Sequence, residues 1–239
     1  MQIIESRENR LFAHEMKFLL PSSLAEPVRA WARARLEPDP NADVTSGDSY
    51  RITSIYFDTA DFRVFRQQGS YGRAKYRIRR YNCSPTVFLE RKLRTRGIVT
   101  KRRTLMPISD LARLHEAGRW FHRRIAARAM SPVCLVSYDR IALMTVRSDE
   151  PVRLTMDFAL CAAPASDLSF RPDAASIPLQ QGYSVLELKF RFAMPSLFKE
   201  LLGEFQLCPQ SVSKYRLAVP ALGLTDVLPQ TEKPDAAYA

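Results

Sequence analysis

Basic side chains recur at every second position in several segments, and this spacing places them on one face of a β-strand. Lys75, Arg77 and Arg79 have this spacing, and successive side chains of a strand point to opposite faces of its sheet. The interval from Arg73 to Arg103 holds twelve Lys or Arg and one acid, Glu90. Arginine binds phosphate oxygens through paired N–H donors, and lysine adds a point charge. The pattern therefore predicts a strand face that binds a polyanion.

Carboxylates occur at a few places within these basic faces, at Glu15, Glu90, Asp157 and Glu187. Mg²⁺ and Mn²⁺ bind carboxylate oxygens, and in phosphoryl transfer such ions bridge phosphate oxygens. We therefore predict that these carboxylates hold Mn²⁺ or Mg²⁺ beside bound phosphates. Glu187 taken alone is more often the ion-pair partner of Lys189 than a metal ligand, and both interpretations stay open at this point.

A sheet with one solvated, charged face is the simplest alternative, because a run of charges is usually exposed. Two observations favour an enclosed site instead. The charged faces are mostly basic, and like charges on adjacent strands repel unless an anion neutralises them. If the sheet closes into a barrel, these faces point inward and line a polar lumen.

The elements that must position these side chains are mostly strands. Strand-like runs occur at residues 12–20, 51–58, 71–81, 86–94, 98–105, 133–144, 152–160 and 183–190, with turns expected at 82–85 and 95–97. Helices are expected at 22–35, where Ser22 or Ser23 can cap and Trp31 is buried, at 110–116, from 118 to about 130, and at 195–205. Many strands and few helices predict an α+β fold, a closed antiparallel β-barrel with helices packed outside.

Composition excludes several other classes. The chain has 239 residues and a formal charge of +11, and no uncharged apolar run approaches the roughly 20 residues that span a bilayer. Four Cys form no CxxC pair and three His form no HxxxH, so neither a disulfide framework nor a structural zinc site is expected. We expect a reducing cytoplasmic location, one domain over residues 10–220, and a disordered C-terminal tail over 221–239.

Nine short motifs occur in an order that resembles a known family. They are HEMKFLL (14–20), SIYFDTADF (54–62), KYRIRRY (75–81), VFLERK (87–92), VTKRR (99–103), SYDR (137–140), VRLTMDF (152–158), VLELKF (185–190) and SVSKYRL (211–217). Together they resemble the VTC-type polyphosphate polymerase domain, a branch of the triphosphate tunnel metalloenzymes, over residues 10–219. The resemblance implies a closed antiparallel barrel whose inward basic side chains grip a triphosphate or polyphosphate.

The resemblance also implies roles for individual residues. Carried over by position, the catalytic side chains are Arg77, Arg79, Lys92, Arg140 and Lys214, which also bind phosphate. Further phosphate-binding side chains are Lys17, Lys101 and Tyr138 by position, with Lys75 and Lys189 as candidate lumen residues, as is Arg153. Glu187 fits the metal-binding glutamate, and Glu15, Glu90 and Asp157 are further candidate ligands.

The implied reaction moves the γ-phosphate of ATP onto a growing polyphosphate chain with Mn²⁺ or Mg²⁺. ATP and inorganic polyphosphate are the expected partners. The eukaryotic members carry a regulatory domain and membrane helices that this sequence lacks, so we expect no membrane insertion by this chain. A membrane-protein partner encoded elsewhere stays open.

Three alternatives to polymerisation remain. A triphosphatase would use the same tunnel and admit water as the acceptor. A non-catalytic module would only bind polyphosphate or a nucleotide. A nucleic-acid binder is a weaker hypothesis, because no groove-reading helix or RNA-binding signature is visible, and no nucleic-acid partner is expected.

Overall fold

A computed structural model describes residues 5–6, 14–39, 48–95, 98–145, 151–171 and 176–225 of the chain. Its strands are β1 (Glu5–Ser6), β2 (His14–Pro21), β3 (Glu37–Pro38), β4 (Ser49–Thr59), β5 (Ala74–Tyr81), β6 (Thr86–Thr95), β7 (Ile98–Pro107), β8 (Met130–Met144), β9 (Arg153–Pro164), β10 (Ile177–Pro178) and β11 (Tyr183–Phe190). Its helices are α1 (Ser22–Arg33), α2 (Leu114–Ala117), α3 (Arg119–Ala126), α4 (Ser196–Glu204) and α5 (Lys214–Ala221).

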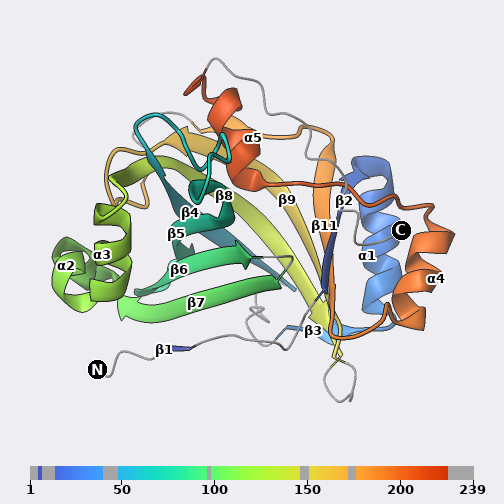
Figure 1. The fold of residues 1–239 in the computed structure, drawn as a ribbon. Helices are drawn as coiled ribbons and strands as arrows, with labels where there is room; N and C mark the ends of the chain where they lie inside the picture. Colours follow the sequence, from blue (N-terminus) through green and yellow to red (C-terminus); the bar gives the residue numbers. More distant parts are fainter. Residues whose placement is uncertain are drawn as a thin grey trace.

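The strands form a single antiparallel sheet in the order β1-β7-β6-β5-β4-β8-β9-β11-β2, and β3 and β10 pair with β8 and β9 beside this path. The sheet curves, as Figure 1 shows, until strands near its two ends approach each other. Lys92 of β6 contacts Glu15 of β2 at 3.0 Å between Nζ and Oε1. The predicted antiparallel sheet is confirmed. Among the described residues β1 and β2 do not pair, and backbone closure of the barrel stays a prediction.

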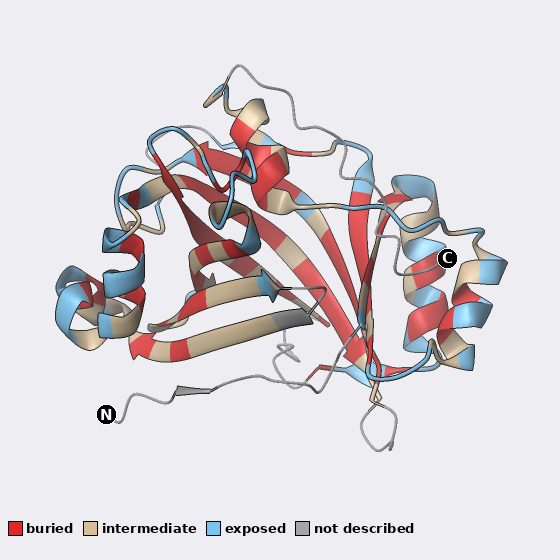
Figure 2. Ribbon diagram, in the orientation of Figure 1, coloured by how far each residue is buried: buried red, intermediate tan, exposed pale blue. Residues whose placement is uncertain are grey.

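Apolar side chains lie on the outer face of this curved sheet, because charged side chains occupy the inner face. Along β5, Tyr76 and Ile78 are buried in a hydrophobic cluster, while Arg77 and Arg79 point the other way. Burying the outer apolar face requires a covering layer. Helices supply it, which confirms that they pack outside the sheet, and Figure 2 shows their buried sides turned to the strands.

Two groups of helices provide this cover. In one cluster, Trp31 of α1 and Phe198 of α4 are buried together with Phe18 of β2. In the other, Phe121 of α3 meets Tyr76 edge-on at 5.8 Å between ring centroids. The burial of Trp31 was predicted. The serine cap of α1 was not borne out, because Pro21 holds the N-cap position and no side chain caps the helix.

Some element boundaries differ from the sequence prediction. Tyr71–Arg73 form a 3-10 helix, and the strand begins only at Ala74. The first part of the predicted helix at 110–116 is a 3-10 helix, Ile108–Arg113. The helix expected to reach residue 130 ends at Ala126, since β8 already begins at Met130. Of the turn predicted at 95–97, Thr95 ends β6, and residues 96–97 lie outside the described residues. Of the tail predicted at 221–239, Ala221 still belongs to α5, and Leu222 and Leu224 pack against the hydrophobic core. The tail from residue 226 lies outside the described residues.

The helix α5 was missing from the predicted elements, and its burial explains why. Tyr215, Arg216, Ala218 and Val219 are all buried, so the segment has no polar stripe at helical spacing. Pro220 lies inside the helix and further weakens a sequence-based assignment.

A buried aspartate fixes α5 to the sheet. Asp58, at the end of β4, is fully buried and accepts hydrogen bonds from the backbone N–H groups of Thr59 at 2.7 Å, Val64 at 2.9 Å and Phe65 at 2.9 Å. The Tyr215 hydroxyl donates to the same carboxylate. Asp58 therefore joins the loop after β4 to the helix that follows the last strand.

Asp58→Asn should destabilise the fold, because an amide group cannot accept all four hydrogen bonds and would face a donor with its own N–H. We expect the free energy of unfolding to fall by about 1–3 kcal/mol, measured by urea denaturation. Asp61→Asn in the same loop is the matched control, since its side chain is 52% exposed. Equal stability of the two variants would contradict this role for Asp58.

Candidate functional site: the inner face of the sheet

The inner face of the sheet brings together every phosphate-binding and metal-binding candidate from the sequence. Strand pairing sets neighbouring side chains side by side: Arg77 lies opposite Glu90, which lies opposite Arg103. Toward the other edge of the sheet, on the same inner face, Glu187 of β11 lies between Lys17 of β2 and Thr155 of β9. Three carboxylate-centred groups result.

The first group surrounds Glu90, which is 2% exposed in its side chain. Its Oε2 contacts Arg77 Nε at 2.6 Å and Arg79 Nε at 4.0 Å. Its Oε1 contacts Lys101 Nζ and Arg103 Nε, each at 3.1 Å. One carboxylate thus orients four cations, and the group keeps a positive excess.

The second group surrounds Asp157, which is fully buried. Arg140 binds it with two donors, Nε to Oδ1 at 2.5 Å and Nη2 to Oδ2 at 2.7 Å. Lys214, the first residue of α5, reaches Oδ2 at 2.5 Å. Tyr138 lies beside both cations, with Lys214 Nζ 4.6 Å from its ring centroid. Its hydroxyl accepts a hydrogen bond from Arg79 at 3.0 Å and so links this group to the first.

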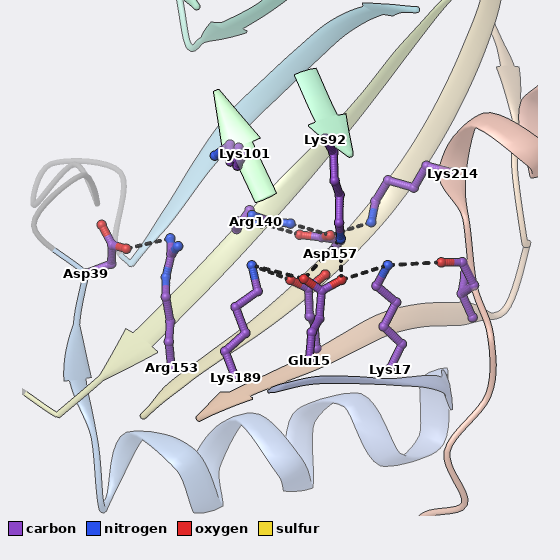
Figure 3. A network of polar contacts seen from close by, with 12 residues as sticks. Glu15, Lys17, Asp39, Lys92, Lys101, Arg140, Arg153, Asp157, Lys189 and Lys214 are labelled. Carbon is purple, nitrogen blue, oxygen red and sulfur yellow. Dashed lines mark hydrogen bonds and ion pairs between the residues drawn. The ribbon is translucent and has the colours of Figure 1, made fainter. Parts of the chain in front are cut away.

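The third group contains Glu15 and Glu187, drawn in part in Figure 3. Lys189 Nζ contacts Glu187 Oε1 at 2.7 Å and Glu15 Oε2 at 3.6 Å. Lys17 and Lys92 contact Glu15 Oε1 at 3.1 and 3.0 Å. The two carboxylates therefore converge on one lysine, which places their oxygens close together.

The segment before α5 crosses one end of the inner face. The Gln210 backbone N–H donates to the Lys17 carbonyl at 2.7 Å, and Lys17 Nζ donates to the Val212 carbonyl at 3.3 Å. Lys75 Nζ donates to Ser213 Oγ at 2.9 Å. Figure 1 shows this segment passing from α4 to α5. It covers the end where Lys75 lies and brings Lys214 onto the inner face.

The cations keep the buried carboxylates ionised. Burial opposes the charge of Glu90, but Arg77, Arg79, Lys101 and Arg103 hold its pKa well below its usual range. Burial likewise opposes the charge of Asp157, and Arg140 with Lys214 lowers its pKa. For Glu187, burial and nearby Glu15 raise the pKa, yet Lys189 and Lys17 dominate and bring it to about 2.

The exposed fraction of each charged side chain decides which of them a ligand on the inner face would contact. Lys92 is 39% exposed and Lys17 27%, whereas the side chains of Glu90, Asp157 and Glu187 are exposed by 2%, 0% and 9%. Glu90, Asp157 and Glu187 therefore lie beneath the lysine ammonium groups, whereas Glu15 is 27% exposed and Arg79 and Arg140 are only 5% and 8% exposed. The accessible surface of the site is cationic and suits a chain of phosphates.

The carboxylates of the inner face differ in how well they could coordinate a divalent metal. Among the described residues, no three His, Cys, Asp or Glu side chains gather in one place. Mg²⁺ requires only one or two carboxylates when phosphates and water complete its shell. Glu187 fits this requirement best, because Lys189 is its one ion-pair partner among the described residues, and Glu15 converges with it on that lysine. Glu15, Glu90 and Asp157 are each contacted by two or more cations.

Sequence reasoning omitted Arg103 and three tyrosines from the site. Arg103 is two residues beyond Lys101 on β7, so strand alternation alone could have placed it on the same face. Tyr56 accepts a hydrogen bond from Arg77 at 3.3 Å, Tyr81 from Arg103 at 2.8 Å and Tyr50 from Arg153 at 3.3 Å. Tyr56 and Tyr81 lie within the motifs SIYFDTADF and KYRIRRY, but the motifs assigned them no role, and Tyr50 lies outside every motif.

Some arginines of the interval from Arg73 to Arg103 do not lie on the inner face. Arg102 packs over the Trp120 ring of α3, 4.4 Å from its centroid, and its strand partner is Arg91. Arg80 donates to the carbonyls of Ser84 and Cys83. These side chains belong to the outer face and to a turn.

The curved antiparallel sheet with a basic inner face defines a triphosphate tunnel protein, a class of phosphate-handling enzymes. The family model of the VTC domain matches residues 12–222. The chain therefore belongs to the VTC domain family, as its motifs indicated.

Solved structures that resemble the chain are distant in sequence. A candidate adenylate cyclase from Bacillus halodurans has a TM-score of 0.50 at 13% identity, covering 84% of this chain and 94% of that one. HpAC1 from Hippeastrum, a candidate adenylyl cyclase described as having a dominant triphosphatase activity, has a TM-score of 0.49 at 14% identity, covering 87% and 95%. No curated protein matches the chain. In the part of the chain that the structure describes, no helix is long and apolar enough to cross a membrane.

Glu90→Gln should destabilise the protein, because four cations would lose the carboxylate that holds them together. Removing one partner of a buried ion pair costs about 3–5 kcal/mol, measurable by urea denaturation. Inorganic tripolyphosphate should restore much of the loss by binding the same cations in the folded state. Glu116→Gln, whose side chain is 62% exposed, is the control. A Glu90→Gln variant as stable as this control would contradict the electrostatic account.

Arg103→Gln should raise the pKa of the Tyr81 phenol. Burial alone would raise that pKa, but the charges of Arg79 and Arg103 bring it to about 8. Removing one of these charges destabilises the phenolate, so its midpoint moves to higher pH. Ultraviolet difference absorbance reports the phenolate, and subtracting the Tyr81→Phe titration isolates its signal. An unchanged midpoint would show that Arg103 does not act on this hydroxyl.

Proposed function

We propose that this VTC domain is a metal-dependent phosphotransferase that moves the γ-phosphate of ATP onto a growing polyphosphate chain and releases ADP. The observation that carries the proposal is the cationic inner face, on which Arg and Lys side chains outnumber the carboxylates. A chain of linked phosphates offers the repeated negative charge that such a surface neutralises.

Phosphoryl transfer requires little covalent chemistry from a protein, and positioning with charge stabilisation supplies most of the rate. Arg79, Arg140 and Lys214 meet around Tyr138, from β5, β8 and α5, and Glu90 joins Arg77 to Arg79. We assign these side chains, with Lys92, to the phosphates that react. Lys17, Lys75, Lys101 and Lys189 would bind the remainder of the two phosphate chains.

Glu90 and Asp157 hold the arginines ready before any ligand arrives. Their ion pairs fix the guanidinium groups, so that phosphate oxygens find donors already oriented. Preorganised donors of this kind cost no reorganisation at the moment of reaction. We therefore treat these two carboxylates as positioning residues and not as the metal ligands that the sequence allowed.

A divalent cation would be held by Glu187 and Glu15, with phosphate oxygens and water completing its coordination. When bound, Mn²⁺ or Mg²⁺ neutralises charge on the transferring phosphates. Glu187 and Glu15 would then exchange part of their contact with Lys189 for contact with the metal. A cytoplasmic location and a membrane-protein partner for the product stay predictions.

The direct test is incubation with ATP and Mn²⁺ or Mg²⁺, followed by separation of products by chain length. The proposal predicts release of ADP together with lengthening polyphosphate. Hydrolysis of triphosphate to diphosphate and phosphate without polymer would contradict it and would assign the triphosphatase reaction to the same side chains. Binding without turnover would contradict any catalytic role.

Glu187→Gln should raise the metal concentration needed for half-maximal activity by at least about 10-fold, since even residues behind a metal ligand alter affinity by this amount. Direct Mn²⁺ binding, followed by electron paramagnetic resonance, gives a second readout. Glu200→Gln, on the exposed side of α4, is the matched control. Unchanged metal dependence in Glu187→Gln would remove Glu187 from the metal site.

A further inference from the structure

The helix α3, outside the sheet, carries arginines that the proposed reaction does not use. From Arg113 to Arg128 the chain has five Arg, no Lys and a single acid, Glu116. Phe121 and Ile125 of α3 are buried in the hydrophobic core, so the opposite side of this helix faces solvent. Figure 2 shows that side as exposed. The arginines on it are Arg119, Arg123 and Arg124, and all three are exposed.

The strands next to α3 and the residues after it extend this basic surface. Arg91 of β6 and Arg102 of β7 are strand partners, and the Arg102 guanidinium lies 4.4 Å from the centroid of the Trp120 ring of α3. Arg128 follows α3 and lies over the Tyr71 ring at 5.1 Å from its centroid. We call these six side chains the arginine surface; they are Arg91, Arg102, Arg119, Arg123, Arg124 and Arg128.

The acids nearest to α3 in the sequence bind other side chains. Asp110 Oδ1 contacts Arg113 Nη2 at 3.2 Å, and Glu116 Oε1 contacts His115 Nε2 at 3.5 Å. Neither acid therefore neutralises the three exposed arginines of α3. A surface with this excess of one sign of charge attracts an anionic partner.

The composition of the arginine surface favours a protein over a bilayer or a nucleic acid. Arg and Trp are enriched in protein interfaces and Lys is depleted, and this surface joins six Arg to Trp120. The exposed large apolar side chains of the described residues, Tyr183 and Phe192, lie in or beside β11, so a bilayer would find no apolar anchor here. Arg102 covers the Trp120 ring and Thr104 accepts from its Nε1 at 2.8 Å, which leaves no free platform for stacked bases.

We propose that the arginine surface is a docking site for an acidic segment of a partner protein, in which Asp and Glu recur. A guanidinium group binds a carboxylate through two parallel hydrogen bonds, so the exposed arginines of α3 match a row of carboxylates. Because α3 packs outside the sheet, the partner and the phosphates of the inner face would contact separate side chains. The inference goes beyond the proposed function and does not rest on it.

The test measures binding of a fluorescein-labelled oligoglutamate peptide to the full chain by fluorescence anisotropy. The triple variant Arg119→Gln, Arg123→Gln and Arg124→Gln should weaken binding at least about 10-fold. All three side chains are exposed, so the fold should persist, and circular dichroism verifies this. A peptide that bound the inner face instead would keep its affinity for this variant.

The matched control removes the same number of charges from the other side of the molecule, near α1 and α4 (Figure 1). It combines Arg35→Gln, Arg191→Gln and Lys199→Gln, three exposed positions, and should change the affinity less than about twofold. Equal weakening in both triple variants, or weakening in neither, would overturn the docking site. Tighter binding of wild type to phosphatidylglycerol vesicles or single-stranded DNA, lost in the α3 variant, would also overturn it. The α3 variant should form polyphosphate from ATP as wild type does, and absence of polymer in both would contradict the proposed function alone.

Discussion

Mutual repulsion among cations gathered on one face of a curved sheet is the constraint on which the rest of this structure depends. The basic side chains there are Lys17, Lys75, Arg77, Arg79, Lys92, Lys101, Arg103, Arg140, Arg153, Lys189 and Lys214, against the carboxylates Glu15, Asp39, Glu90, Asp157 and Glu187. Each carboxylate contacts at least one of these cations and reduces their repulsion without cancelling it.

In an antiparallel sheet with one exposed face, the charged side chains usually face solvent on that face. Here the curvature of the sheet encloses the charged face. Because charge occupies the inner face, the apolar side chains must lie on the outer face, and α1, α4 and α3 cover them. The helix α5 has a different role. Asp58 fixes Tyr215, and Lys214 enters the charged face beside Asp157. The two adjacent residues Lys214 and Tyr215 therefore contribute to the candidate binding site and to the stability of the fold, respectively.

The sequence could predict the inner face because strand alternation is a strict geometric rule. Lys75, Arg77 and Arg79 share a face by spacing alone, and their motif order identified the family. The sequence could not show which cations each carboxylate would contact, since Glu90 and Arg103 or Glu15 and Lys92 meet only through strand pairing and curvature. The helix α5 escaped prediction because tertiary burial of four of its eight residues, and not an amphipathic stripe, stabilises it.

The most direct measurement is a crystal structure of this protein with tripolyphosphate bound. The account predicts phosphate oxygens in contact with Arg77, Arg140 and Lys214 on the inner face, with at least part of the lysine contacts to Glu15 released. Phosphates bound instead at Arg91 and Arg102 on the outer face, with every inner ion pair unchanged, would contradict it.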